Sequence, residues 1–375
     1  MEKRYFKSIG EKISLLGFGC MRLPKLYDDK QDIDEILAQK MIDYAIENGI
    51  NYFDTAYPYH EGMSETFIGK ALKKYPRESF HLTTKMPVWL VQNEDDTERI
   101  FNEQLEKCQV DYFDFYLMHN LNEEHFENAE KHHVYDFLKQ KKAEGKIRHL
   151  GFSFHDSVEL LESIVKTHKW DFAQIQLNYL DWDLQNAKRQ YEILSENNLP
   201  VIVMEPVRGG ALATLSESAI AILKSENPDA SPASWAIRYA ASFPNVLTVL
   251  SGMSNFEQVK DNIQTISDFE PLSEKEREVL QKALTAYRAS GTIPCTGCRY
   301  CMDCPAGVDI PKVFSAYNQY CISKNANVLK ITYQILGEEK QEHHCVNCKK
   351  CVPKCPQKID IPKHMIEIKE TISKL

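Results

Sequence analysis

The chain has 375 residues, 43% of them hydrophobic, and a net charge of −9, which is typical of a globular protein with one large domain and a small one. An acidic chain without a basic stripe is a poor partner for nucleic acid. No run is long and apolar enough to span a bilayer, and the first residues, MEKRYFKSIG, lack the apolar core of a secretory signal. We therefore expect a cytoplasmic protein that binds neither nucleic acid nor a membrane.

The larger part of the chain alternates short apolar runs with amphipathic segments of helix length. The stretch 3–16 alternates in polarity around a glycine, which predicts a hairpin that covers one end of the fold. Segments 34–49 and 127–146 predict helices, and Gly49 and Gly145 stand at positions typical of helix C-terminal glycines. Eight buried strands are predicted at 15–23, 50–56, 80–85, 113–119, 147–154, 172–177, 200–206 and 246–252.

Eight β–α units within about 250 residues fit a closed (β/α)8 TIM barrel. An open, doubly wound sheet is the alternative, because the apolar pattern does not fix closure. Near Gly291 the strands stop and cysteines become frequent, and segments 310–323 and 327–340 predict two helices between the cysteine runs. We therefore predict an α/β barrel domain over 1–290 and a small α-helical domain over 291–375.

Two runs of four cysteines mark this C-terminal domain. The second run has the C-x2-C-x2-C-x3-C-P spacing of ferredoxin-type [4Fe-4S] sites, and the first has one residue fewer before its last cysteine. CPAGVDIPK at 304–312 is echoed by CPQKIDIPK at 355–363, as a pseudo-symmetric two-cluster module requires. Cytoplasmic cysteine clusters more often bind metal than form disulfides, so a ferredoxin-like domain with two [4Fe-4S] clusters is predicted, with two structural zinc sites as the alternative. The candidate ligands are Cys295, Cys298, Cys301, Cys304, Cys345, Cys348, Cys351 and Cys355.

The repeat also predicts how the cysteines divide between the clusters. In two-cluster ferredoxins the cysteine before the proline ligates the other cluster. We therefore expect Cys355 to join the first three cysteines of the first run, and Cys304 to join the first three of the second. The shorter gap between Cys301 and Cys304 must still allow this crossing.

Polar residues follow three consecutive strands of the predicted barrel. Asp54 ends the second strand, Lys85 the third and His119 the fourth, and Tyr59 comes five residues after Asp54. Barrel enzymes place their active sites at the C-terminal ends of the strands, so these four side chains are expected to meet at one rim. Each residue alone is a weak signal, but together they predict a catalytic site.

Five stretches of the chain carry a resemblance to a known family: FDTAYPYHEGMSETFIGKAL, TTK, LMHN, GFS and SGMSNFEQVKDNI. They resemble the aldo-keto reductase family, and the resemblance covers residues 4–285. The cysteine-rich tail resembles the two-[4Fe-4S] module of a bacterial and archaeal branch of that family. The resemblance implies an oxidoreductase that uses NADPH or NADH to reduce a carbonyl of a small molecule, an aldehyde or ketone, or that catalyses the reverse reaction.

The resemblance also implies a role for each catalytic residue. Tyr59 donates the proton to the carbonyl oxygen, and the Lys85 cation is expected to lower the pKa of this phenol toward the working pH. Asp54 pairs with Lys85, and His119 orients the carbonyl oxygen. Tyr57 competes for the role of donor, and the family's spacing of five from the aspartate selects Tyr59.

The residues that the resemblance assigns to the nicotinamide cofactor follow later strands. They are Ser153 and Gln174 near the carboxamide, Met204, Pro206, Arg208, Gly209 and Gly210 in the loop after the seventh strand, and Gly252, Ser254, Gln258 and Asn262 after the last strand. Many NADPH-dependent members carry a lysine and an arginine where Gly252 and Gln258 stand. Because a point charge for a 2′-phosphate is missing there, NADH is a possible cofactor. His60 stands where a glycine often follows the tyrosine.

Three functions fit this combination of domains. The first is an oxidoreductase that joins a nicotinamide barrel to an electron-transfer tail, with a separate redox partner protein. The second is a plain carbonyl reductase whose clusters are structural, and the third is a regulatory subunit that binds the cofactor without turnover. Nicotinamide moves two electrons and each cluster moves one, and the sequence shows no flavin motif to convert between them. The complete set of Asp54, Tyr59, Lys85 and His119 argues against the regulatory subunit.

Overall fold

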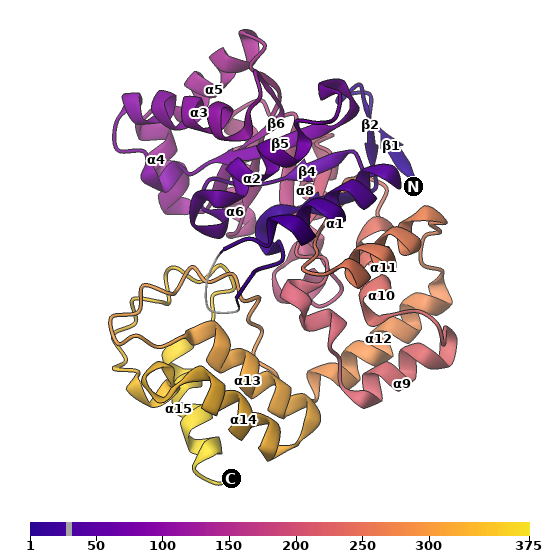
Figure 1. The fold of residues 1–375 in the computed structure, drawn as a ribbon, viewed down its shortest axis with the longest axis vertical. Coiled ribbons are helices and arrows are strands. Elements are labelled where there is room, and N and C mark those ends of the chain that lie inside the picture. The colour runs from indigo at the N-terminus through magenta and orange to yellow at the C-terminus, as the bar shows by residue number, and fades with distance from the viewer. Residues whose placement is uncertain (28–31) are drawn as a thin grey trace. The chain divides into compact units, whose positions relative to one another are not determined.

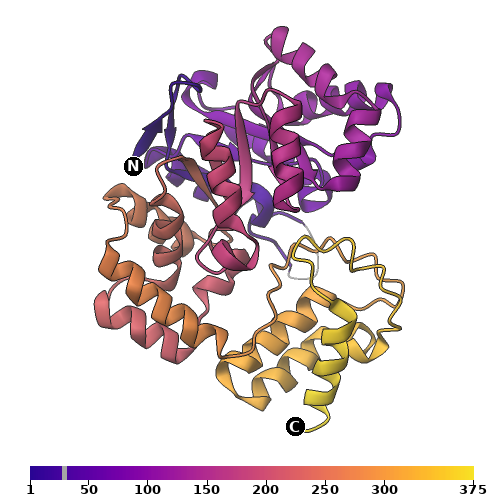
Figure 2. The same cartoon turned by 180° about the vertical axis from the view of Figure 1, so that it is seen from behind.

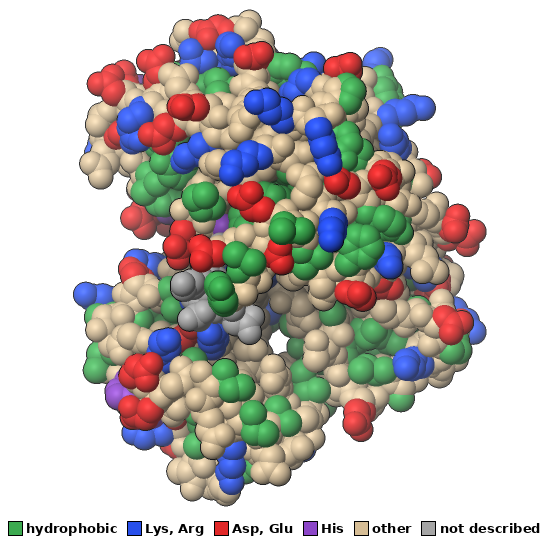
Figure 3. Space-filling model, viewed as in Figure 1, with side chains coloured by type: hydrophobic (Ala, Val, Ile, Leu, Met, Phe, Trp, Pro, Cys, Tyr) green, Lys and Arg blue, Asp and Glu red, His purple; other side chains and the backbone are tan. Residues whose placement is uncertain are grey.

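The protein is described by a computed structural model that covers residues 1–27 and 32–375. The chain forms two compact units, of which one comprises Met1–Pro206 with Ala236–Pro271 and the other comprises Val207–Trp235 with Leu272–Leu375. On the face shown in Figure 3, acidic and basic side chains are interspersed. Among the described residues, no helix has the length and apolar character needed to cross a membrane.

The first unit holds a closed barrel of eight parallel strands, which confirms the predicted TIM barrel and excludes the open sheet (Figure 1). Closure occurs where the last strand pairs with the first, as in the pairing of Leu250 with Gly17. The strand interiors are buried almost without interruption, as expected where helices cover a parallel sheet. The strands are β3 Leu16–Gly19, β4 Tyr52–Asp54, β5 His81–Met86, β6 Phe113–Leu121, β7 Ile147–Phe154, β8 Phe172–Gln176, β9 Val201–Met204 and β10 Val246–Gly252.

The predicted N-terminal hairpin is present and closes one end of the barrel. Strand β1 (Lys3–Tyr5) pairs antiparallel with β2 (Lys12–Ser14). Ile9 and Ile13 are buried in a cluster with strand residues such as Phe115. The opposite end, where the parallel strands terminate, is left for the site.

The helices of the first unit follow the strands in order. They are α1 Glu35–Glu47, α2 Met63–Leu72, α3 Glu94–Cys108, α4 Glu123–Lys131, α5 Val134–Ala143, α6 Val158–Thr167, α7 Asp181–Leu184, α8 Ala187–Glu196 and α11 Phe256–Ser267, with α10 Pro232–Ala241 at the border of the units. Gly49 and Gly145 have φ angles of 92° and 76° just after helices, as predicted. Segment 127–146 was predicted as one helix, and this is wrong. His133 adopts a left-handed φ of 51°, which ends α4 and starts α5.

The second unit contains both helices that were predicted between the cysteine runs, and one helix after the second run that was not predicted. The second predicted helix ends at Leu336, before Gly337, and not at residue 340. Helices α13 (Ile310–Ser323), α14 (Ala326–Leu336) and α15 (Ile361–Ile372) lie side by side in both views (Figures 1 and 2). They share a core that includes Phe314 and Met365, and most of the cysteines of the two runs pack against it. This confirms the helical character of the cysteine-rich segment.

The sequence repeat has a structural counterpart in this unit. Asp309 accepts a hydrogen bond from the backbone N–H of Lys312 at the start of α13, and Asp360 does the same for Lys363 at the start of α15. A proline follows in the first turn of each helix, where its missing N–H is not needed. The two Asp-Ile-Pro-Lys segments are therefore equivalent helix starts.

The compact units do not divide at Gly291. Helices α9 (Glu217–Glu226) and α12 (Glu274–Arg288) pack against each other and belong to the second unit, although both lie in the part of the chain predicted as barrel domain. Lys275 of α12 also forms an ion pair with Glu226 of α9 at 2.8 Å.

Candidate active site and cysteine-lined cavities

Three consecutive barrel strands bring Asp54, Lys85 and His119 together at their C-terminal ends, as predicted. Lys85 Nζ lies 2.5 Å from Asp54 Oδ1 and 2.8 Å from the backbone oxygen of Thr55, and it also donates to Tyr59 Oη at 3.5 Å. The rings of Tyr59 and His119 lie edge to face, with centroids 6.1 Å apart. Lys85 is only 1% exposed, so its ammonium charge acts in a site shielded from water.

The loop after β4 positions Tyr59 through unusual backbone geometry. Tyr59 begins the short 3-10 helix η2 (Tyr59–Gly62), and His60 and Glu61 adopt left-handed φ angles of 51° and 54°. A glycine would adopt the conformation of His60 without strain, which fits the glycine common at this position in the family. Such strained residues gather at functional sites, where the surrounding structure holds them in place.

The competing tyrosine points elsewhere. Tyr57 donates its phenol hydrogen to Glu103 Oε2 at 2.9 Å, on helix α3. Lys107 of the same helix lies over the Tyr57 ring. These contacts direct Tyr57 away from Lys85, so the geometry favours Tyr59 as the donor.

Burial shifts the pKa values of Asp54 and His119. It raises the pKa of the Asp54 carboxyl, against the opposing effects of Lys85 and of Gln174, whose Nε2 donates to Asp54 Oδ2 at 3.1 Å. Burial, reinforced by the charge of Lys85, holds the pKa of His119 well below its ordinary value. His119 is therefore a neutral imidazole. Its Nδ1 is buried without a hydrogen-bond partner among the described residues, which leaves an orphaned polar atom inside the site.

The expectation that Lys85 lowers the pKa of Tyr59 needs correction. The pKa of this phenol lies well above its ordinary value, because burial and the charges of Asp54 and Glu205 disfavour the phenolate. Asp54 is 2.5 Å from the ammonium and the phenol is 3.5 Å from it. The lysine charge is therefore largely offset by the carboxylate before it reaches Tyr59.

Sequence reasoning missed an aromatic wall beside these residues. Trp89, in the 3-10 helix η4 (Val88–Leu90), lies 5.1 Å from the His119 ring and stacks on His125 at 5.3 Å between centroids. The signal was present, since Trp89 follows the third strand and so belongs to the same rim. Such a wall offers apolar contact to the body of a small substrate.

The residues assigned to the nicotinamide end of the cofactor already have partners within the barrel. Gln174 is bonded to Asp54, and Ser153 Oγ accepts the backbone N–H of Asn120 at 2.7 Å. Met204 ends β9 beside Gln176 of β8. These contacts place Ser153, Gln174 and Met204 at the same rim as the catalytic residues.

The residues assigned after the last strand lie at the closure of the barrel. Ser254 donates its hydroxyl to the backbone oxygen of Arg22 at 2.8 Å and its N–H to Gln258 Oε1 at 2.7 Å. Asn262 Nδ2 donates to Ser251 Oγ at 2.9 Å. They surround the start of α11, and a helix N-terminus of this kind favours a phosphate.

Sequence reasoning also missed a cation, Arg22, beside the last strand of the barrel. A Cβ on Gly252 would approach the side-chain carbons of Arg22 to 3.2 Å, so Arg22 lies directly beside the last strand. Its guanidinium pairs with Glu205 Oε1 at 3.3 Å. Because β3 and β10 are neighbours only when the barrel closes, this proximity could be inferred only after closure was assumed.

Arg208 does not extend toward solvent as a cofactor ligand would. It is 1% exposed, and its guanidinium donates to the backbone oxygen of Pro294 at 2.6 Å and to Gln357 Oε1 at 2.8 Å. All three residues belong to the second unit, beside the cysteine runs. The assignment of Arg208 to the cofactor stays a prediction. Gly209 and Gly210 follow in exposed positions with φ angles of 63° and 94°.

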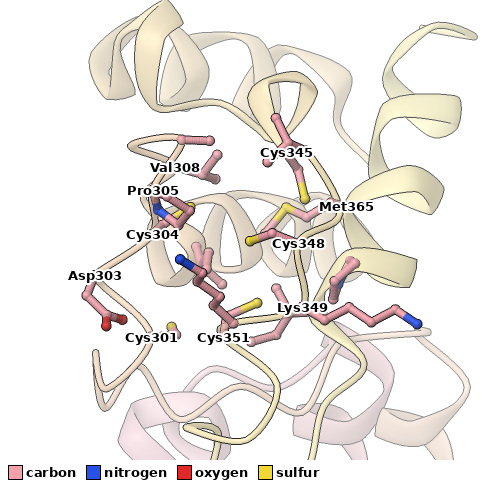
Figure 4. A pocket seen from close by; sticks show the side chains of 16 residues that line it. Cys301, Asp303, Cys304, Pro305, Val308, Cys345, Cys348, Lys349, Cys351 and Met365 are labelled. Carbon is pink, nitrogen blue, oxygen red and sulfur yellow. The ribbon is translucent and has the colours of Figure 1, made fainter.

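The eight predicted metal ligands line two cavities, in the predicted crossed arrangement. The first cavity is lined by Cys295, Cys298, Cys301 and Cys355. The second is lined by Cys304, Cys345, Cys348 and Cys351, with Cys301 at its edge. In Figure 4 the sulfur atoms of Cys304, Cys345, Cys348 and Cys351 face a common space, while Lys349 points away. The shorter gap between Cys301 and Cys304 is therefore long enough for the chain to cross.

The donor sets fit iron–sulfur clusters better than zinc. Four thiolates bound to one zinc at about 2.3 Å lie only about 3.8 Å apart. Among the described residues, no three of these sulfur atoms lie within 4.8 Å of one another, which suits a larger group. The rest of both linings is mainly apolar, with Ile310 and Ile361 common to the two cavities. Burial raises the pKa of the Cys351 thiol to about 11, so binding of a metal group would displace its proton.

Comparison with known proteins agrees with this geometry. The model of the aldo/keto reductase family matches residues 15–285, and that of the 4Fe-4S dicluster domain matches residues 294–360. The chain belongs to the aldo/keto reductase family, and it is an oxidoreductase that carries a 4Fe-4S domain after its barrel. The two matches fall on either side of Gly291.

Individual relatives cover about three quarters of this chain or less. The uncharacterized oxidoreductase YqkF of Bacillus subtilis (strain 168) is 26% identical over 312 residues, which are 75% of this chain and 96% of that protein. The NADH-specific methylglyoxal reductase of Escherichia coli (strain K12) is 29% identical over 198 residues, 48% of this chain and 60% of that protein. The solved structure of aldo-keto reductase AKR11C1 from Bacillus halodurans, in its holo form, is 27% identical with a TM-score of 0.63 and covers 76% of this chain and 96% of its own.

Proposed function

We propose that this protein reduces the carbonyl of a small aldehyde or ketone with NADH or NADPH, through Asp54, Tyr59, Lys85 and His119. The observation that carries the proposal is the contact of one buried ammonium, Lys85 Nζ, with both Asp54 at 2.5 Å and the Tyr59 phenol at 3.5 Å. The orphaned Nδ1 of His119 can form a hydrogen bond with a polar group, and the Trp89 ring beside it offers contact to a small apolar body. The reverse oxidation uses the same residues.

The residues divide the proton chemistry between them. When bound, the nicotinamide supplies a hydride to the carbonyl carbon, so that negative charge grows on the oxygen. Tyr59 gives that oxygen its proton, and its raised pKa keeps the phenol protonated until then. Lys85 lies within reach of the phenolate left behind and stabilises it. His119, neutral and buried, orients the carbonyl oxygen, and Asp54 holds Lys85 in place.

The cofactor residues that we propose lie in or after strands β7 to β10 in the sequence. Ser153, Gln174 and Met204 would lie near the nicotinamide, with Pro206, Gly209 and Gly210 along the loop after β9. Gly252, Ser254, Gln258 and Asn262 would lie near the adenosine. Arg22 beside Gly252 is the cation available there, and Glu205 offsets its charge. This balance supports weak discrimination between NADH and NADPH.

The C-terminal domain, 291–375, would hold two [4Fe-4S] clusters that carry single electrons to a separate redox partner. Cys348 is exposed next to the exposed Lys349 and Lys350, so the second cavity lies at the protein surface. This domain has 12 Lys and Arg against 8 Asp and Glu, while the whole chain has a net charge of −9. A basic surface over an electron-transfer site fits an acidic carrier protein. Purely structural clusters remain the alternative, since they need no such access.

The test compares two single substitutions that each remove one phenol hydroxyl. We expect Tyr59→Phe to lower kcat by at least about a hundredfold on any aldehyde or ketone that the native enzyme reduces, since general acid catalysis contributes about 10²–10⁴. Fluorescence titration should show that the variant still binds NADH or NADPH. Tyr57→Phe is the matched control and should keep most of its activity, because that hydroxyl contacts Glu103. Near-native turnover of Tyr59→Phe would remove the assignment.

A further inference from the structure

The segment between helix α14 and the second cysteine run brings two histidines and a glutamate together. Glu338 begins the 3-10 helix η6 (Glu338–Lys340), and His343 and His344 end the 3-10 helix η7 (Glu342–His344). Glu338 Oε1 lies 2.8 Å from His343 Nε2 and 3.2 Å from His344 Nε2. One donor atom of each side chain lies within 4.8 Å of those of the other two. These are metal-ligating atoms that belong to neither the barrel site nor the linings of the cysteine cavities.

The distances between these atoms suit a small divalent ion. Zinc binds imidazole nitrogen and carboxylate oxygen at about 2.0–2.2 Å, so the ligand atoms around a tetrahedral zinc lie about 3.3–3.6 Å apart. The separations from Glu338 to the two imidazoles, 2.8 and 3.2 Å, lie within about half an ångström of that range. Two imidazoles and one carboxylate leave a fourth position for water, as in zinc sites with three protein ligands.

The charges around the group also favour a cation. Within residues 1–27 and 32–375, the ion-pair partners of Glu338 are the two imidazoles, and no lysine or arginine pairs with its carboxylate. A second group of three such donors, in the barrel, contains Asp114, and there Arg77 and Arg148 already pair with the carboxylate at 2.6 and 3.0 Å. A metal ion in the barrel group would be repelled by two guanidinium groups, whereas an ion beside Glu338 would not.

Several contacts hold the backbone of this segment in place. Asp309 donates its backbone N–H to the oxygen of Lys340 at 3.0 Å, and Gln341 Nε2 donates to the backbone oxygen of Tyr333 at 3.2 Å. Glu342 is buried, and η7 packs against α15. The three ligand side chains themselves are between 34% and 73% exposed, so an ion can reach them from solvent. An anchored backbone reduces the entropy cost of binding.

The position of the group gives a bound ion a structural role. Cys345, the first cysteine of the second run, directly follows His344, and its N–H donates to the backbone oxygen of Glu342 at 3.0 Å. An ion held by Glu338 and both histidines would cross-link η6 to η7. Such a cross-link opposes local opening of the segment that leads to Cys345.

We propose that Glu338, His343 and His344 bind one divalent transition-metal ion, for which zinc is best suited, and that this ion stabilises segment 338–345. Imidazole together with carboxylate suits zinc and its neighbours among the transition metals, whereas magnesium and calcium prefer oxygen ligands alone. The site uses none of the eight cysteines. The inference is therefore independent of the proposed carbonyl reduction and of the clusters.

The experiment uses the full-length protein without an affinity tag, purified without oxygen, as native chain, Glu338→Gln, His343→Gln and the control His364→Gln. His364 Nδ1 lies 2.7 Å from Glu367 Oε2, but in the described part of the chain this pair does not form a group of three with another histidine, cysteine or carboxylate. The control therefore removes an imidazole–carboxylate contact of the same domain that has only two donors. Zinc bound per chain is measured by equilibrium dialysis at increasing concentrations of free zinc.

The result is the difference between chains, because every variant keeps all eight cysteines and zinc bound to them cancels. At saturation of the native chain, we expect it to hold one zinc ion more than Glu338→Gln or His343→Gln. Loss of a ligand should weaken binding at least about a hundredfold, since loss of an outer partner already costs about 10–100-fold. His364→Gln should bind zinc as the native chain does. Zinc should also slow hydrogen exchange at the amides of His344 and Cys345 in the native and control chains alone.

Three results would overturn the inference. They are equal zinc binding by the native chain and either ligand variant, an equal loss of zinc in His364→Gln, and zinc binding that leaves exchange at His344 and Cys345 unchanged. Circular dichroism shows in each variant that the helices are folded.

Discussion

The ion pair of Arg22 and Glu205 lies at the end of the barrel where we propose that the cofactor binds. The side-chain carbons of Arg22 lie beside Gly252, where the family resemblance puts the 2′-phosphate, and its guanidinium pairs with Glu205 at 3.3 Å. A carboxylate at this distance offsets the attraction that the arginine would offer to a phosphate. The same carboxylate also raises the pKa of Tyr59, after burial and Asp54. One acidic residue therefore acts on both the cofactor end and the catalytic end of the site.

We predict that Glu205→Gln shifts the preference toward NADPH. The change removes a negative charge next to Arg22, so the dissociation constant for NADPH should fall several-fold and that for NADH should change little. Fluorescence titration of the native chain should give a preference for NADPH below about a hundredfold, or about 2.7 kcal/mol. Arg22→Ala should weaken NADPH binding instead. Equal changes for both cofactors would mean that neither residue lies near the phosphate.

At the scale of secondary structure, the sequence predicted the features that depend on local patterns, which are the strands of the barrel and the residues at their ends. Buried parallel strands are continuous apolar runs, so all eight strands were found, and the residues at their ends came together as expected. The break at His133 was missed, because a histidine gives no warning of a left-handed conformation. The contacts of Arg22 and Arg208 were not predicted, because their partners lie more than eighty residues away in the chain, at Glu205 and at Pro294.

The repeated helix starts also have unequal surroundings. Asp309 and Asp360 cap α13 and α15 in the same way, but Asp309 also pairs with Arg299 at 3.5 Å. Ile310 and Ile361, directly after these caps, line both cysteine cavities. The caps therefore connect helix stability to the shape of the cluster sites.

We predict that Asp360→Ala and Asp309→Ala both speed the release of iron to a chelator under anaerobic conditions. Each loses a cap worth about 1 kcal/mol, and Asp309→Ala should be the more destabilised because it also loses the Arg299 contact. The control is Asn325→Ala, which removes the cap of α14 away from the cavities. If iron left Asn325→Ala as fast as the other two, the caps would have no particular connection to the cluster sites.

On the scale of the whole molecule, the barrel and the C-terminal domain depend on different sources of stability. The barrel has a closed sheet and a large apolar core of its own. The C-terminal domain, residues 291–375, has three helices, and its small core is bordered by the cysteines themselves. So small a segment gains little from apolar burial alone, and domains of this kind commonly need a bound metal. Helices α9 and α12 pack against each other.

We therefore predict that anaerobic removal of iron unfolds residues 291–375 and leaves the barrel folded. Hydrogen exchange should lose protection in α13, α14 and α15, because the four sulfur ligands of each cavity are no longer tied together. Strands β3 to β10 should keep their protection, and the iron-free protein should still bind NADH or NADPH.

Helices α9 and α12 should also stay protected, since α12 has its own capping box at Ser273 and packs on α9. That result would place the folding boundary near Gly291, whereas a joint loss of protection in α9, α12 and α13 would place it at the edge of the second compact unit. Loss of protection throughout the barrel strands would contradict the independence of the two parts.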